Sequence, residues 1–205
     1  FLPFVTVLLT WRLPADRLAG VRRGLAVFLG LHLAIVVALS QTSLTQWQHF
    51  KHYKRIVEAV RAPELVQQVA APGVVLMGHA YSAASIYGYA AGQHVPVFGL
   101  GSVHARQDDL VVDYSRFDGR TIRVLRTRAP APGEYEPYFH AVRTWQVVQD
   151  GQPFHVVEGQ GFRFDVYRQQ VLNEVNRRYY AVPAWLPGRG CVFCERLCGA
   201  ARCAP

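Results

Sequence analysis

One uncharged stretch constrains the fold more than any other part of the chain. Residues 24 to 40 are almost entirely apolar on every side of a helix, and they reach the lower end of the length that crosses a bilayer. A second apolar segment, residues 1 to 10, is too short to span. A helix buried in a soluble core is the less favoured alternative, because another apolar segment lies just before it in the sequence. We predict a spanning helix at residues 24 to 40 and the end of a truncated membrane helix at residues 1 to 10.

The segment between these two helices predicts their orientation. Asp16 is the only acidic residue among the first 40, and short loops rich in Lys and Arg stay in the cytoplasm. We therefore predict a cytoplasmic loop at residues 11 to 23, with everything after Ser40 outside the cytoplasm. These basic residues also account for part of the net charge of +8, which argues against a nucleic-acid partner. They are Arg12, Arg17, Arg22 and Arg23.

The membrane part carries three further expectations. The chain has neither an initiating Met nor a basic region ahead of an apolar core, so we expect it to begin inside a longer protein rather than with a signal peptide. His32 lies in mid-span, where an ionisable side chain is costly, so it should face other helices for packing or for a functional role. The predicted location is a bacterial inner membrane, with the C-terminal part periplasmic or extracellular.

Residues 41 to 71 are predicted to form an amphipathic connecting helix. Apolar side chains recur at helical spacing between residues 44 and 61, with basic residues among them. One interpretation is a helix at the membrane surface, with Trp47 and Tyr53 at the depth of the lipid headgroups. The other is a plain connecting helix packed on its own domain. The pattern does not decide between them.

Residues 72 to 190 predict a small mixed α/β domain. A strand, a helix and a second strand follow one another closely, which predicts a βαβ unit with parallel pairing. Asp150-Gly151 between two alternating segments predicts a β-hairpin. The fold class is therefore α/β, with a mixed sheet that follows the transmembrane segments. The predicted elements are strands at 74–77, 95–100 and 121–128, hairpin strands at 140–149 and 154–158, and helices at 80–91 and 162–180.

The tail, residues 191 to 205, holds all the cysteines of the chain. An oxidising compartment favours disulfides, although a tetrahedral zinc site, an iron–sulfur site and unpaired thiols remain open. Four cysteines permit three pairings, and the sequence does not choose among them. The disulfide or metal candidates are Cys191, Cys194, Cys198 and Cys203.

Other motifs carry little chemistry. Phosphate-cradling loops and standard hydrolase signatures are absent from the sequence. Tyrosines crowd the helix predicted at residues 80–91, where we expect them to fill the core. Carboxylates at positions 108, 109 and 113 offer hard ligands for a cation, with solvated loop side chains as the commoner alternative. We predict no metal site.

The order of the segments from residue 24 to residue 128 resembles a known family. After the spanning helix and the connecting helix come a strand, a tyrosine- and alanine-rich helix, a strand that contains Pro96, and an Asp118-Gly119-Arg120 turn. This order is similar to the C-terminal periplasmic domain of GT-C glycosyltransferases of the dolichyl-phosphate-mannose-protein mannosyltransferase and lipid A aminoarabinose transferase type. The segments that carry the resemblance are Tyr81-Ser-Ala-Ala-Ser-Ile-Tyr87-Gly-Tyr89-Ala and Arg106-Gln-Asp-Asp-Leu.

The resemblance implies a membrane enzyme that moves a sugar from a polyprenyl-phosphate carrier to an envelope acceptor. It places an acidic residue that acts as the catalytic base in the first periplasmic loop, which precedes this chain. No catalytic residue and no cofactor is therefore expected here, although the parent enzyme could bind a divalent cation. Membrane lipid and the lipid-linked sugar donor are the implied partners. The residues expected to face the acceptor or a cavity are His79, Tyr81, Arg106 and Asp108. The alternative function is a non-catalytic, membrane-anchored periplasmic binding module.

Overall fold

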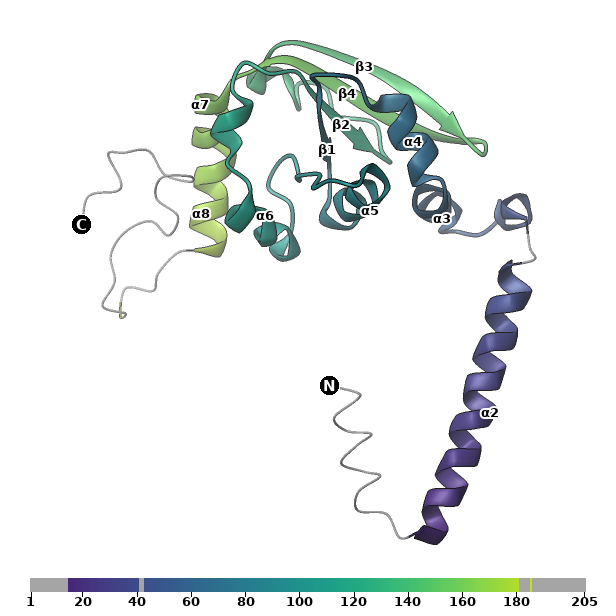
Figure 1. Ribbon diagram of the computed structural model, residues 1–205. Coiled ribbons are helices and arrows are strands. Elements are labelled where there is room, and N and C mark those ends of the chain that lie inside the picture. Colours follow the sequence, from purple (N-terminus) through teal and green to yellow (C-terminus); the bar gives the residue numbers. More distant parts are fainter. Residues whose placement is uncertain (1–14, 41–42, 181–184, 186–205) are drawn as a thin grey trace. The chain divides into compact units, whose positions relative to one another are not determined.

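The computed structural model describes residues 15–40, 43–180 and 185 (Figure 1). The chain divides into two units, residues 1–49 and residues 50–205. The folded domain therefore begins near Phe50, well before the boundary predicted at residue 72. The partial helix predicted at residues 1 to 10 and the cysteine tail lie outside the described residues.

The first unit contains one long helix, α2 (Ala15–Ser40), followed by a short 3-10 helix, η1 (Leu44–Trp47). The segment Leu18–Ser40 is long and apolar enough to cross a membrane by length and composition, and none of it is buried by the protein. The prediction of a loop up to residue 23 is wrong for residues 15 to 23. They are helical because alanine, leucine and arginine are good helix formers and no proline or glycine pair interrupts them.

Two short helices open the second unit, α3 (Tyr53–Val60) and α4 (Ala62–Val69). Tyr53 is only 2% exposed, and its hydroxyl donates a hydrogen bond to the backbone oxygen of Asp150 at 3.3 Å. Its predicted place at the lipid headgroups is therefore wrong, because the hairpin turn buries this side chain within the domain. Pro63 in the first turn of α4 separates the two helices.

The sheet has the strand order β1-β2-β4-β3, and only β1 and β2 are parallel. The predicted hairpin is confirmed: its turn has φ of 45° at Asp150 and 75° at Gly151, the left-handed values that a two-residue connection requires. The mixed α/β fold class is also confirmed, with β1 and β2 joined by helices. The strands are β1 (Val75–Gly78), β2 (Ile122–Arg126), β3 (Phe139–Gln149) and β4 (Gln152–Phe162).

The connection from β1 to β2 differs from prediction in one element. Helix α5 (Tyr81–Ala91) forms as expected and ends at Gly92, which has φ of 64°. The strand predicted at 95–100 is reduced to a single parallel bridge between Gly78 and Val97. Pro96 has no N–H to donate, and positive φ values at Gly99 and Gly101 turn the chain away. The connection then runs through η2 (Val103–Ala105), α6 (Arg106–Val111) and η3 (Tyr114–Phe117).

Helices cover both faces of the sheet. Side chains of Met77, Val124 and Val157 point to one face, where they pack with Tyr167 and Val171 of the C-terminal helical segment. Alternate side chains of the strands point to the other face, toward α3, α4 and α5 (Figure 1). The helix predicted at residues 162–180 is thus confirmed from Phe164 to Tyr179, with an apolar stripe that faces the sheet. That segment consists of α7 (Phe164–Tyr167), the π-helical η5 (Arg168–Leu172) and α8 (Asn173–Tyr179), and η4 (Glu136–Tyr138) precedes β3.

Close contact between α5 and β1 depends on Gly78. A Cβ atom at this position would lie 2.8 Å from the backbone of Ala84, so only glycine permits the approach. Tyr87 is completely buried on this side of α5, as predicted. Tyr81 and Tyr89 are instead 39% and 93% exposed, because the helix turns them away from the sheet. The prediction that all three tyrosines fill the core is wrong for these two.

Candidate functional site

His79 and Tyr81 lie where the chain leaves β1 and enters α5. The His79 Nδ1 atom is 3.4 Å from the backbone oxygen of Leu125, and the side chain is half-buried. Burial lowers the pKa of His79, and the neighbouring Arg126 lowers it further. The Tyr81 ring centroid is 6.1 Å from that of His104. These residues occupy the carboxyl end of a parallel strand, where α/β folds commonly place ligands.

The Arg106 side chain is fixed by an ion pair, a hydrogen bond to the backbone and a contact with an aromatic ring. Its Nη1 lies 3.0 Å from Asp109 Oδ2, and its Nη2 donates to the backbone oxygen of Leu100 at 2.9 Å. The guanidinium also lies 4.6 Å from the centre of the Tyr179 ring, while the Tyr180 hydroxyl donates to Asp109 at 2.7 Å. Arg106 therefore ties α6 to the end of α8, and this structural role accounts for its position.

Asp108 closes the edge of the sheet beyond β1. Its Oδ2 accepts a hydrogen bond from the Val97 backbone N–H at 2.6 Å, and its Oδ1 lies 3.1 Å from His94 Nε2. The Tyr114 hydroxyl donates to the Val97 carbonyl at 2.7 Å. Both backbone groups of Val97 are thus satisfied by side chains, which prevents another strand from pairing there. Burial raises the pKa of Asp108, although the Val97 N–H and His94 oppose this.

A cavity of about 240 Å³ brings Tyr81 and Asp108 together. His79 and Arg106 are not among the residues that line it. The Ser85 hydroxyl in its wall donates to the Tyr81 backbone oxygen at 2.9 Å, so its proton is already engaged. The polar and aromatic lining residues are Tyr81, Ser85, Tyr89, Gln93, His94 and Asp108.

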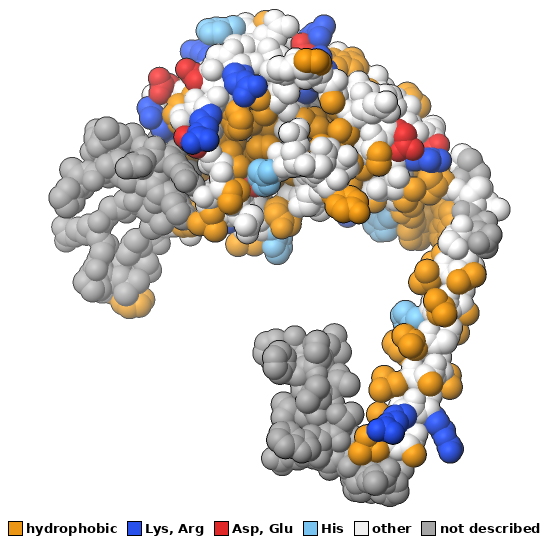
Figure 2. Space-filling model, in the orientation of Figure 1, with side chains coloured by type: hydrophobic (Ala, Val, Ile, Leu, Met, Phe, Trp, Pro, Cys, Tyr) orange, Lys and Arg blue, Asp and Glu red, His pale blue; other side chains and the backbone are white. Residues whose placement is uncertain are grey.

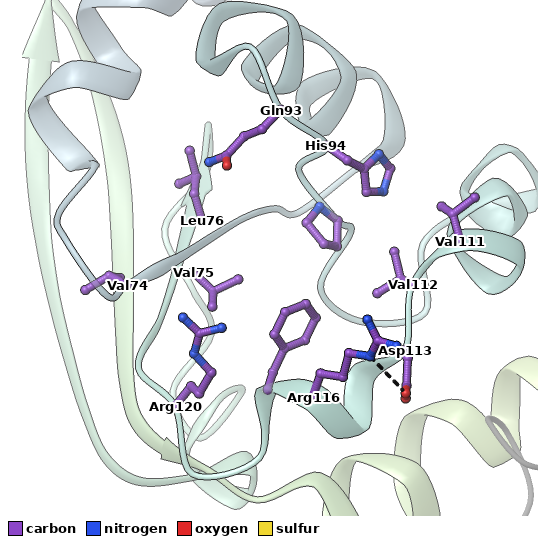
Figure 3. A pocket seen from close by; sticks show the side chains of 12 residues that line it. Val74, Val75, Leu76, Gln93, His94, Val111, Val112, Asp113, Arg116 and Arg120 are labelled. Carbon is purple, nitrogen blue, oxygen red and sulfur yellow. Dashed lines mark ion pairs between the residues drawn. The ribbon is translucent and has the colours of Figure 1, made fainter.

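A second cavity, of about 370 Å³, lies at the opposite ends of the parallel strands (Figure 3). Its wall is mixed, and its polar side chains come from segments far apart in the sequence. Figure 3 shows Arg120 beside Val75, with Arg116 paired to Asp113 at 3.5 Å. His94 lines both cavities. The walls include Val75, Leu76, Pro96, Val112 and Phe117.

The arrangement supports two kinds of chemistry. The His94 imidazole is oriented by the buried Asp108 carboxylate, a pairing that can hold or transfer a proton at a cavity wall. Arg116 and Arg120 can bind an anion, because a guanidinium offers several donors in a plane. Apolar side chains beside two cations in a mixed wall fit an anionic ligand that also carries an apolar part.

A shared cation site among the three aspartates is not supported. Asp108 and Asp109 have separate partners, and Asp113 instead accepts from the Ser115 N–H at 3.1 Å to cap η3. Among residues 15–40, 43–180 and 185, no group of three or more His, Cys, Asp or Glu side chains could hold a metal ion. The four tail cysteines lie outside this described part.

Sequence reasoning missed His94, Arg116 and Arg120. Each stands in a short polar segment that reads as a solvated loop, and no motif spacing connects them. The cavities form only because the bridge at Val97 and the helix η3 bring these loops together. The one local signal was the position of His94, two residues after the helix-ending Gly92 and two residues before Pro96.

Comparisons of the chain with protein-family models, with curated proteins and with solved structures gave no match. The likeness to GT-C glycosyltransferases therefore rests on the order and pattern of the sequence segments alone.

Proposed function

We propose that this chain is the C-terminal, accessory part of an integral-membrane glycosyltransferase that moves a sugar from a polyprenyl-phosphate donor to an envelope acceptor. The observation that carries the proposal is the direct passage from one long apolar helix into a folded α/β domain. Helix α2 exposes its apolar side chains on all sides, which is costly in water and favourable in lipid. The resemblance of the following segments supplies the enzyme class.

The orientation of the chain across the membrane in this proposal follows from the basic residues near the N-terminal end of α2. Arg22 and Arg23 lie in its first turns, and positive residues at one end of a span favour the cytoplasmic side. The α/β domain then lies on the outer side of a bacterial inner membrane. There it would meet membrane lipid and the lipid-linked sugar donor. The acidic residue that acts as the catalytic base belongs to the part of the enzyme that precedes this chain, and the domain shapes the path of the acceptor.

Two experiments test the proposal. Alkaline phosphatase fused after residue 180 should be active in cells, whereas a fusion that ends within residues 11 to 14 should be inactive. Membrane vesicles containing the complete protein should consume one of a panel of polyprenyl-phosphate-linked sugars, and deletion of residues 50–205 should reduce this turnover. A complete, membrane-inserted protein that consumes none of the panel would contradict the transferase assignment.

The second candidate is a membrane-anchored binding module, which the cavity of Figure 3 favours. Arg116 and Arg120 in its mixed wall would provide an anion-binding site that needs no enzyme. Titration of the purified chain with inorganic phosphate and with phenyl phosphate would distinguish the candidates. Binding to the chain with no sugar transfer by the complete protein would favour the module.

A further inference from the structure

Large apolar side chains are exposed on the part of the second unit formed by Phe50, α3 and α5. Phe50 is 49% exposed, Val60 on α3 is 53% exposed and Tyr89 on α5 is 93% exposed. Val60 and Tyr89 border a groove of about 680 Å³ between α5 and the α3–α4 corner. Other residues that line the groove are Ala59, Ala62, Pro63, Ser85, Ile86 and Ala90. An exposed, largely apolar groove of this kind is typical of a contact site in soluble domains.

Exposed apolar side chains are also present on η2 and α6. Val103 on η2 is 61% exposed, and Leu110 and Val111 on α6 are 55% and 59% exposed. Figure 2 shows hydrophobic side chains gathered along the margin of the folded unit where α3, α5 and α6 lie in Figure 1. The sheet strands β3 and β4 occupy the opposite margin. We call the surface formed by Phe50, α3, α5 and α6 the helical face.

The covalent connection limits how far the helical face can lie from a membrane. Helix α2 ends at Ser40 and the folded unit begins at Phe50. Ten residues span at most about 36 Å when fully extended. Helix η1 occupies part of this connection and shortens it further. Phe50, where this tether enters the folded unit, belongs to the helical face itself.

The charges beside the helical face suit a negatively charged surface. Lys51 and Arg55 are exposed, whereas Glu58, the acidic residue of α3, is buried and accepts a hydrogen bond from Tyr87 at 2.5 Å. Exposed apolar and aromatic side chains bordered by basic residues are typical of helices that lie in the headgroup region of anionic bilayers. Tyrosine is also enriched at this depth.

We propose that the helical face binds the surface of an anionic phospholipid bilayer, with Val60 and Tyr89 inserted among the headgroups. The inference rests on the membrane anchoring of α2 proposed above. It differs from the sequence prediction for residues 44 to 61, because Tyr53 is buried and the contact includes α5 and α6. Bilayer binding would hold the two cavities at a fixed height above the membrane.

The test places the whole chain in phospholipid nanodiscs containing phosphatidylglycerol. A cysteine carrying the fluorophore NBD is introduced by Tyr89→Cys, in a background where the tail cysteines are replaced by serine. The matched control is Thr144→Cys, an exposed position on β3, the edge strand farthest from β1. We expect lipids with a spin label near the headgroup to quench NBD at position 89 at least two-fold and to leave NBD at position 144 unchanged.

Equal quenching at positions 89 and 144, with the chain inserted in the discs, would overturn the inference and leave the anchoring intact. Failure of the chain to enter the discs would overturn the proposed function as well. Loss of quenching with zwitterionic lipid, or in the Lys51→Gln/Arg55→Gln variant, would support the anionic surface. NBD self-quenching between two copies in one disc, without quenching by lipid, would overturn the inference in favour of a dimer.

A second measurement keeps the native cysteines. Benzoylphenylalanine introduced in place of Tyr89 should form photo-crosslinks to lipid, and the same residue in place of Thr144 should form none. Crosslinks at neither position, in discs that contain the folded chain, would contradict bilayer contact.

Discussion

Two buried carboxylates at opposite parts of the sheet have contrasting surroundings. Glu158 in β4 is 2% exposed and lies 2.6 Å from Arg123 and 2.7 Å from Arg143. Asp108, at the sheet edge, is 3% exposed but is held by a backbone N–H and by His94. The hydrogen bond from Arg143 is the main cause that lowers the pKa of Glu158 to about 2, whereas burial raises that of Asp108.

Glu158 is a structural carboxylate held by fixed cations, whereas Asp108 lies where a ligand or solvent can change its environment. Arg123 and Arg143 also lie 5.5 Å and 5.3 Å from the centre of the Trp145 ring, which restrains both guanidinium groups around Glu158. Asp108 instead borders a cavity, and its side-chain partner is a histidine whose side chain is 51% exposed. Burial and charge alone do not mark a functional acid; the number of fixed cations around it matters.

The largest expected effect is that of Glu158→Gln. The substitution leaves Arg123 partly buried without its carboxylate, and we expect a loss of about 3 kcal/mol in the free energy of unfolding. This is the low end for a broken buried pair, because Arg143 is 63% exposed and water can solvate it again. Urea denaturation of the detergent-solubilised chain, followed by tryptophan fluorescence, would measure it. The control Asp165→Asn, in a pair whose carboxylate is 76% exposed, should have no measurable effect.

Asp108→Ala should have the second-largest effect. It leaves the Val97 N–H buried without an acceptor, which costs about 2 kcal/mol in the free energy of unfolding. Asp108→Asn retains an oxygen that can accept from Val97, so its loss should be under about 1 kcal/mol. The same denaturation experiment compares the two variants. Equal losses would show that the charge, rather than the edge hydrogen bond, is the stabilising feature.

These two clusters also show which features the sequence could predict. Local signals sufficed for the hairpin at Asp150-Gly151, for α5 with its terminal Gly92, and for the apolar stripe of the last helix. The sequence did not predict the burial of Glu158, since a charged residue in an alternating strand ordinarily faces water. Its partners come from β2 and β3, so the cluster depends on the register of three strands. His94 and Asp108 likewise meet only after the chain crosses from α5 to α6.

The pH dependence of stability should have opposite signs for the two acids. Glu158 has a depressed pKa, so its contribution is complete above its unfolded value near 4.5 and is lost as pH falls toward 2. Asp108 has a raised pKa, so its contribution is complete below 3.8 and is lost as pH rises through its folded value.

Denaturation from about pH 5 down to about pH 3 provides the test of these signs. The difference between the wild-type chain and Glu158→Gln should shrink as pH falls. The difference between the wild-type chain and Asp108→Asn should grow, by a smaller amount, because the hydrogen bonds from Val97 and His94 oppose the effect of burial. Parallel curves for the two variants would mean that the carboxylates do not differ as described.

The smallest effect on stability is expected for Arg116→Ala and Arg120→Ala, since both side chains are exposed at the cavity of Figure 3. Their effect should instead appear in ligand affinity: each substitution removes one cation, and the dissociation constant for phenyl phosphate should rise roughly ten-fold. Calorimetric titration measures this, with Arg177→Ala on α8 as the exposed control. Unchanged affinity in both variants would remove the anion site.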